Sequence, residues 1–256
     1  MLLCVAAVSN SWVGATSSAA NSAFIGDWKL DPSRSKLTDV MKVERIGAAK
    51  YVFNFGGGPQ TIVVDGTDQP GGFGSTLSVA PENRNTWRVI RKRDGRLLIS
   101  ARWTLSADGN TLTDHYTGFD ASGTAHSVNY VYRRKTPGSG FSAEWVSMSE
   151  TVNSVIMLEI RPYADDGLSF IEPSVSLTRN LKFDGKDYPN LGPNIAPGST
   201  SSIRRLNEHT LEITCKIGGS VVYTQQIELS MDLNTLTIVR YIVGQSESNV
   251  RVFNKQ

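Results

Sequence analysis

An internal repeat constrains this chain more than any other feature of its sequence. The segment Leu105–Thr113 (LSADGNTLT) returns as Leu229–Thr237 (LSMDLNTLT), and the similarity extends without gaps over Thr86–Tyr116 and Thr210–Arg240. A constant offset of 124 residues relates the two segments. Because such a repeat marks a duplicated structural unit, the sequence predicts two similar domains rather than one irregular domain.

Three further landmarks occur in the same order in both copies. These matches are Gly26-Asp27-Trp28 with Ala143-Glu144-Trp145, Asp65–Pro70 (DGTDQP) with Asp184–Pro189 (DGKDYP), and Val131-Tyr132 with Val252-Phe253. We therefore place a first domain at residues 24–135, a linker rich in turn formers at 136–140 and a second domain at 141–256. Each domain has about 115 residues, which is enough to bury a core of its own.

The first 23 residues resemble an export signal in composition. They carry no charged side chain and pass from the apolar segment Met1–Val8 to small residues such as Ser18-Ala19-Ala20. A secretory leader has this pattern, although here no Lys or Arg precedes the apolar run. We interpret residues 1–23 as a leader, with a disordered tail as the alternative, and expect a secreted or periplasmic protein. Only Cys215 would remain in the mature chain, so no internal disulfide is expected.

The rest of the composition is that of an ordinary globular protein. Lys and Arg number 26 against 24 Asp and Glu, so the chain as a whole offers no excess charge for a nucleic acid or a membrane surface. Outside the leader no apolar run reaches the length of a membrane-spanning helix, and none is expected.

Both copies show the pattern of short antiparallel strands. In the second copy Leu211, Ile213, Cys215 and Ile217 alternate with polar residues, which is the period of a half-buried strand. Gly218-Gly219 follows, and the first copy has Asp94-Gly95 at the same place; both pairs suit a two-residue hairpin turn in which both residues have positive φ. We expect eight or nine strands in each copy and no helix. In the repeated loop, Asn110 and Asn234 are the residues expected to take the left-handed conformation.

An antiparallel sheet of this size hides its edges most directly by closing into a barrel. The predicted fold class is therefore all-β, with two tandem up-and-down antiparallel barrels. The first-strand Gly-x-Trp, the meander and the final Val-Tyr-x-Arg or Val-Phe-x-Lys strand resemble the lipocalin and fatty-acid-binding-protein superfamily. Phe183–Pro189 is also similar to a segment of uncharacterised bacterial lipocalin-like exported proteins. Copy two has alanine in place of the glycine that precedes the tryptophan motif.

No catalytic or metal-binding group emerges from the sequence. The histidines are His115, His126 and His209, and no Gly-x-Ser-x-Gly motif accompanies them. The recurring aspartates of the two DGxD turns are expected to cap their own backbone. The glycine-rich segments 56–59 and 71–74 lack the Lys-Ser/Thr of a phosphate loop. We interpret them as loops that could lie at a barrel mouth. We expect no enzyme activity, no metal and no cofactor.

A comparison of the copies suggests one ligand site. If both hairpins have two-residue turns, Arg91 lies opposite Leu98, and Arg91 shares a face with Trp87 and Arg102, whereas Cys215 holds the place of Arg91 in copy two. An arginine inside the barrel would need an anionic partner. The alternative is that Arg91 faces water within the basic run Arg88–Arg96, since a slip of one residue reverses every side chain.

The resemblance implies a site of the same kind, because relatives with this fold bind carboxylates through an arginine and a tyrosine of late strands. The matching residues are Tyr130 and Tyr132, followed by Arg133. The sequence thus predicts a non-enzymatic carrier for a small apolar or amphipathic molecule, with a carboxylate among the groups it would accept. The alternative is a structural or protein-interaction module of the bacterial envelope whose barrels are filled with side chains. A hydrolase or isomerase has no support in the sequence.

Overall fold

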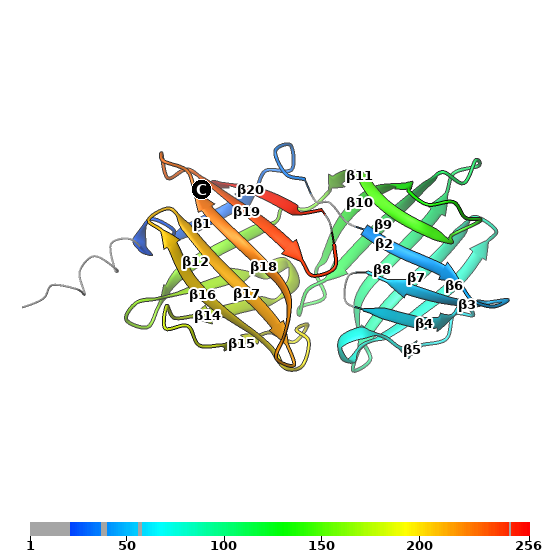
Figure 1. Cartoon of the computed structure of the whole chain (residues 1–256), viewed down its shortest axis with the longest axis horizontal. Helices are drawn as coiled ribbons and strands as arrows, with labels where there is room; N and C mark the ends of the chain where they lie inside the picture. The colour runs from blue at the N-terminus through cyan, green and yellow to red at the C-terminus, as the bar shows by residue number, and fades with distance from the viewer. Residues whose placement is uncertain (1–20, 37–39, 56–57, 246) are drawn as a thin grey trace, which may run out of the picture.

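The computed structural model describes residues 21–36, 40–55, 58–245 and 247–256, and these residues form an all-β molecule. Two antiparallel ten-stranded sheets lie side by side (Figure 1). The predicted fold class is confirmed, with one or two strands more per sheet than expected. No helix within these ranges is long and apolar enough to cross a membrane.

The sheet that we call the first barrel is barrel-like but incompletely closed. Its order is β4-β3-β2-β11-β10-β9-β8-β7-β6-β5, and no ladder joins β4 to β5. Its elements are β2 (Val40–Arg45), β3 (Lys50–Asn54), β4 (Pro59–Val63), β5 (Gln69–Pro70), the 3₁₀ turn η1 (Gly72–Gly74), β6 (Thr76–Asn83), β7 (Thr86–Arg93), β8 (Arg96–Leu105), β9 (Thr111–Phe119), β10 (Ala125–Arg134) and β11 (Ala143–Val152).

The second barrel is closed. Its order is β1-β12-β13-β14-β15-β16-β17-β18-β19-β20, with β20 returning to β1. Its elements are β1 (Gly26–Leu30), β12 (Met157–Tyr163), β13 (Gly167–Glu172), the 3₁₀ turn η2 (Pro173–Val175), β14 (Leu177–Leu181), β15 (Tyr188–Leu191), β16 (Ser199–Asn207), β17 (Thr210–Ile217), β18 (Ser220–Leu229), β19 (Thr235–Ile242) and β20 (Asn249–Lys255).

The two copies exchange their first strands. β1 pairs with β12 and β20 in the second barrel, whereas β11 pairs with β2 and β10 in the first. Sheet membership therefore differs from the predicted ranges 24–135 and 141–256. Segment 136–140, expected to link two domains, joins the neighbouring strands β10 and β11 of one sheet. Turn-forming residues are equally suited to a hairpin loop, and the chain instead changes sheet between β1 and β2 and again between β11 and β12.

The repeated tryptophan explains why the exchange is possible. Trp28 Nε1 donates a hydrogen bond to the Phe24 carbonyl at 3.0 Å, and Trp145 Nε1 donates to the Phe141 carbonyl at 2.9 Å. Both indoles are fully buried, and each lies against a cation of a last strand, Lys255 for Trp28 and Arg134 for Trp145. The two first strands therefore carry the same anchoring motif, which β1 uses in the second barrel and β11 in the first.

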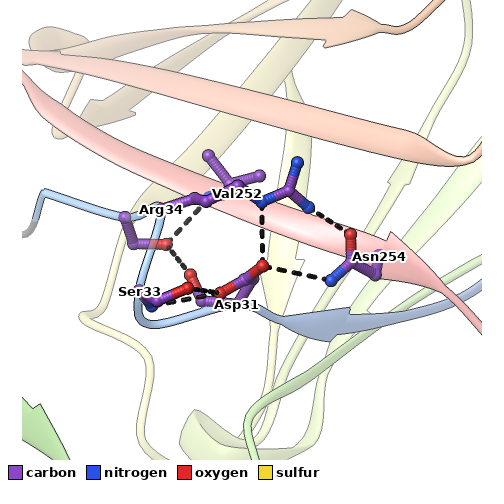
Figure 2. Close-up of polar contacts among 6 residues, drawn as sticks. Asp31, Ser33, Arg34, Val252 and Asn254 are labelled. Atoms are coloured by element: carbon purple, nitrogen blue, oxygen red, sulfur yellow. Dashed lines mark hydrogen bonds and ion pairs between the residues drawn. The ribbon is translucent and has the colours of Figure 1, made fainter.

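Polar contacts hold the crossing that follows β1 against β20 (Figure 2). Asp31 accepts hydrogen bonds from the Ser33 backbone and hydroxyl, from Arg34 Nε at 2.8 Å and from Asn254 Nδ2 at 3.3 Å. The bonds from Ser33 and Arg34 hold the pKa of Asp31 well below its ordinary value. The backbone of Asp31 also donates to the Val252 carbonyl at 2.7 Å, which fixes the start of the crossing to the last strand.

The predicted leader lies outside the described residues up to position 20. Residues 21–23, the last three of the predicted leader, are described and begin a short helical turn, in which Asn21 is buried and donates to the Asp166 carbonyl. Ala23 packs partly against the core of the second barrel.

The predicted hairpin turns are confirmed, but two local details differ from expectation. Asp94-Gly95 and Gly218-Gly219 have positive φ at all four residues. In the repeated loop the left-handed residues are Gly109 (φ 70°) and Leu233 (φ 59°), not the asparagines. Asn110 and Asn234 instead donate their backbone N–H to Asp108 and Asp232, so the aspartate sets the loop geometry.

The second difference is a bulge in β8 and in β18, where Leu98 and Val222 are the extra residues without a partner in the ladder. The register shifts between Arg91 and Lys92, so that Arg91 lies opposite Ile99 rather than Leu98. The same shift occurs between Cys215 and Lys216 in the second barrel. A bulge inserts one extra residue and reverses the facing of the side chains beyond it.

Candidate functional site

The first barrel holds a cavity of about 520 Å³, whereas the corresponding space in the second barrel is about 10 Å³. The larger volume lies within the range of small-molecule binding sites, and the smaller one is about the size of one water molecule. The two copies have thus kept one fold and diverged inside it.

Five interior positions explain the difference. The second barrel places Glu172, Arg179, Tyr223, Arg240 and Arg251 around its small void. From the strand pairings and the repeat offsets, the first barrel has Phe55, Gln60, Ile99, Tyr116 and Tyr130 at these places, all of which line the cavity.

Charged side chains fill the second barrel through direct contacts. Arg179, only 2% exposed, donates to Glu172 Oε1 at 2.6 Å and to the Tyr223 hydroxyl at 2.7 Å. Arg251 lies 3.6 Å from Glu172 Oε2. Burial by itself raises the pKa of Glu172, but the charges of Arg179, Arg240 and Arg251 outweigh it and lower the pKa to about 2. This carboxylate therefore stays ionised inside the barrel.

Two arginines lie at one end of the cavity of the first barrel. Arg91 Nη1 donates to Ser75 Oγ at 2.7 Å, and Nη2 lies 3.4 Å from Gln60 Oε1. Arg93 is 9% exposed and donates through Nη2 to the Phe73 carbonyl at 2.9 Å. Its Nε and Nη1 have no partner among the described residues. Burial is the main cause that lowers the pKa of both arginines, and neither forms an ion pair within the described part of the chain.

The opposite end of the cavity is apolar and aromatic, with one acidic residue. Met41, Val89, Ala101 and Trp103 contribute to its wall. Asp114, which lies opposite Trp103 in the sheet, is the one carboxylate among the described lining residues. Arg91 lies opposite Ile99 of β8, and Ile99 lies opposite Gly118 of β9, so Asp114 lies four residues along β9 from the level of Arg91. That spacing is about 13 Å along the strand.

Loops of the second barrel form part of the cavity wall. Ser174, Val175, Asn194 and Ile195 all line the cavity. Asn194 Nδ2 donates to the Phe119 carbonyl at 2.9 Å, and Ser176 Oγ accepts from the Ala121 backbone at 2.7 Å. We call these four lining residues and their loops the roof of the cavity. Because of the roof and of the exchanged first strands, both copies contribute to the site.

The unpaired seam between β4 and β5 also borders the site. The Gln69 side chain exchanges hydrogen bonds of 2.8 and 2.7 Å with the Val63 backbone and so replaces a ladder that Pro70 cannot extend. Gln60 Oε1 accepts from the Gly72 backbone at 2.9 Å. Glycine-rich segment 71–74 therefore belongs to the cavity wall, as a place at the barrel mouth would require.

The structure brings together three of the six predicted site residues. Arg91, Tyr130 and Tyr132 line the cavity. Trp87 is buried in the adjacent core, where its ring stacks on Phe141 at 3.8 Å. Arg102 and Arg133 are exposed on the outer surface, and Arg102 pairs there with Glu82 at 2.7 Å.

The bulge in β8 accounts for the misplaced arginine. A regular hairpin puts Arg102 on the face of Arg91, whereas the extra residue Leu98 reverses that relation. Sequence reasoning did not identify Arg93, Gln60 and Ser75. Arg93 could have been found from its spacing of two residues from Arg91, which places both on one face of a strand.

The aspartates of the repeated turns have the structural role expected of them. Asp65 accepts from the Thr67 backbone at 2.9 Å, and Asp184 accepts from the Lys186 backbone at 3.1 Å. The second aspartate of each turn pairs with a lysine, Asp68 with Lys92 and Asp187 with Lys216, both at 2.8 Å. Within the ranges that the structure describes, no three His, Cys, Asp or Glu side chains are grouped as metal ligands would be.

No significant match to this chain was found among protein-family models, curated proteins or solved structures.

Proposed function

We propose that this chain is a non-enzymatic carrier of one small amphipathic molecule, which the first barrel holds with its anionic group near Arg91 and Arg93. The observation that carries the proposal is the contrast between the copies. One barrel is filled by a compensated charge cluster, and the other has a cavity of about 520 Å³ in which two arginines form no ion pair with any residue that the structure describes. A filled structural barrel needs no such space, and uncompensated buried charge is costly.

The second barrel supports this function without a ligand of its own. It supplies β1 in exchange for β11 and contributes the loops that roof the cavity. Membership of the lipocalin-like superfamily and export from the cytoplasm remain predictions from the sequence. The envelope interaction module is the alternative function, and the filled interior of the second barrel is the observation in its favour.

Titration with the fluorescent anion 1-anilinonaphthalene-8-sulfonate tests the proposal. We expect saturable binding with one site per chain and at least about tenfold weaker binding for Arg91→Ala, because a hydrogen bond to a charged group contributes about 1.5–3 kcal/mol. Arg102→Ala removes the same charge from the outer surface and should leave the affinity unchanged. Native mass spectrometry of the purified protein would show any small molecule that it retains.

Ala101→Phe provides a second variant that keeps both arginines. Ala101 is 4% exposed and lines the cavity, and the second barrel has Gln225 at the equivalent position. A phenyl ring there should occupy the ligand's space and abolish binding. Absence of saturable binding to the wild-type protein, or equal binding by all three variants, would contradict the carrier function and favour the structural alternative.

A further inference from the structure

We infer that the ligand of the first barrel carries a doubly charged oxyanion, and that it is a phosphate monoester of an apolar molecule rather than a monocarboxylate. The inference rests on the proposed function, because it specifies the chemistry of the same site.

The two arginines are arranged to act on one group. Arg91 and Arg93 are alternate residues of β7 and both line the cavity, whereas Lys92 between them pairs with Asp68 at 2.8 Å. The equivalent residues of the second barrel are Cys215 and Ile217, so neither cation is needed to form the strand. Both positive charges are thus particular to the copy that has the cavity.

Neither arginine forms an ion pair with a described residue, although the charge of Asp94, which follows Arg93 in the hairpin turn, acts on Arg93. Ser75, Gln60 and the Phe73 carbonyl are all neutral acceptors, and they engage only part of the donor capacity of two guanidinium groups. Arg93 is more than nine-tenths buried, with two nitrogens unpartnered in the described residues. A monocarboxylate would neutralise one arginine and leave the other buried and uncompensated, whereas a phosphate monoester brings about two negative charges and three acceptor oxygens.

Asp114 does not provide the missing charge. It lies about 13 Å along β9 from the level of Arg91, at the aromatic end of the cavity. The wall of that end includes Met41, Val89 and Ala101, which suit an apolar body. A ligand with its phosphate near Phe73 and an apolar chain directed toward Trp103 would therefore match the polarity of the cavity.

The competing explanation is that Arg93 only anchors the η1 turn through its bond to Phe73. Phe73 has a φ of 58°, a strained value for a residue with a side chain, so an anchor there has a structural use. An anchor requires one donor and does not require charge. The two explanations differ in how binding depends on the charge of the ligand.

Isothermal titration calorimetry with decyl phosphate, decyl sulfate and decanoate separates them. Decyl phosphate and decyl sulfate have similar tetrahedral head groups, but at pH 8 the phosphate is close to doubly charged and the sulfate singly charged. We expect decyl phosphate to bind at least about tenfold more tightly than either other ligand at pH 8, the gain of one further charge-assisted contact. At pH 5, below the second phosphate pKa of about 6, its advantage over decyl sulfate should vanish. Decyl sulfate at both pH values controls for titration of the protein.

Arg93→Gln should bring the phosphate-to-sulfate affinity ratio close to one while decyl sulfate still binds, and Arg102→Gln should leave the ratio unchanged. Equal affinities of the wild-type protein for all three ligands would overturn the inference and leave the carrier function intact. A phosphate preference that survives in Arg93→Gln would also overturn it, since Arg93 would then be only an anchor. Failure of the wild-type protein to bind any of the three would overturn both proposals.

Discussion

Truncation of Trp28 tests the exchange of first strands, because the side chain precedes the first barrel in sequence but lies in the second. The indole is fully buried, donates a hydrogen bond at 3.0 Å to the Phe24 carbonyl and has the Lys255 ammonium 5.2 Å from its ring. A buried tryptophan removes about 150–250 Å² from water, which at about 25 cal/mol per Å² corresponds to about 5 kcal/mol. We expect Trp28→Ala to cost about 4 kcal/mol, within the usual range for large core truncations.

Hydrogen exchange followed by mass spectrometry shows where that loss falls. In Trp28→Ala we expect faster exchange in β12 and β20, which flank β1 in the second barrel, and in β19, which pairs with β20, with little change in β7–β9. Trp145→Ala is the matched control, because its equally buried indole belongs to β11, and it should give the reverse pattern. Faster exchange of the first barrel in Trp28→Ala would refute the exchanged arrangement.

Three further predictions concern the charge cluster, the repeated loop and the roof. The depressed pKa of Glu172 stabilises the fold above pH 4.5, and about 3 kcal/mol of that stability should be lost as the pH falls from 4.5 through about 2. In urea unfolding, the free energy of unfolding of Glu172→Gln should therefore depend less on pH in this range than that of the wild-type protein, and an equal dependence would contradict the assignment. Leu233→Gly should raise the free energy of unfolding by about 0.5 kcal/mol, because the left-handed conformation costs leucine more free energy than glycine loses through its larger folding entropy; Gly109→Leu should lower it. A loss of stability in Leu233→Gly would be evidence against strain at this position. Asn194→Ala removes the hydrogen bond to the Phe119 carbonyl and should speed release of the bound fluorescent anion about fivefold in stopped-flow fluorescence. Asn190→Ala, inside the second barrel, should leave the release rate unchanged, and equal rates for the two variants would show that the loops of the second barrel do not control release from the cavity.

Local patterns were sufficient to predict the strands and the tight turns. The alternation from Leu211 to Ile217 and the Asp94-Gly95 and Gly218-Gly219 pairs correspond to observed strands and positive-φ turns. These features depend on neighbouring residues and on backbone sterics, both of which a sequence displays directly. The left-handed position of the repeated loop was predicted wrongly, because the hydrogen bonds of Asp108 and Asp232 outweigh the intrinsic preference of asparagine.

The candidate site was predictable only in part. Comparison of the copies singled out Arg91, since an arginine replaces Cys215 on an otherwise apolar face. The facing of Arg102 depends on one bulge, which period-two reasoning cannot place. The roof residues Ser174 and Asn194 come from the other barrel, and nothing near Arg91 in the sequence refers to them.

By itself the sequence determined that the chain is all-β and that it is built twice, and it suggested an arginine inside the first copy. Only the tertiary structure decided which barrel each first strand completes and which interior stays open. The physical reason is that Trp28 and Trp145 carry the same local motif, so the choice depends on contacts more than a hundred residues distant, such as those of β1 with β12 and β20. Likewise, the second interior is filled where Arg179 bonds to Glu172, whereas the equivalent residues of the first barrel, Gln60 and Phe55, line the cavity.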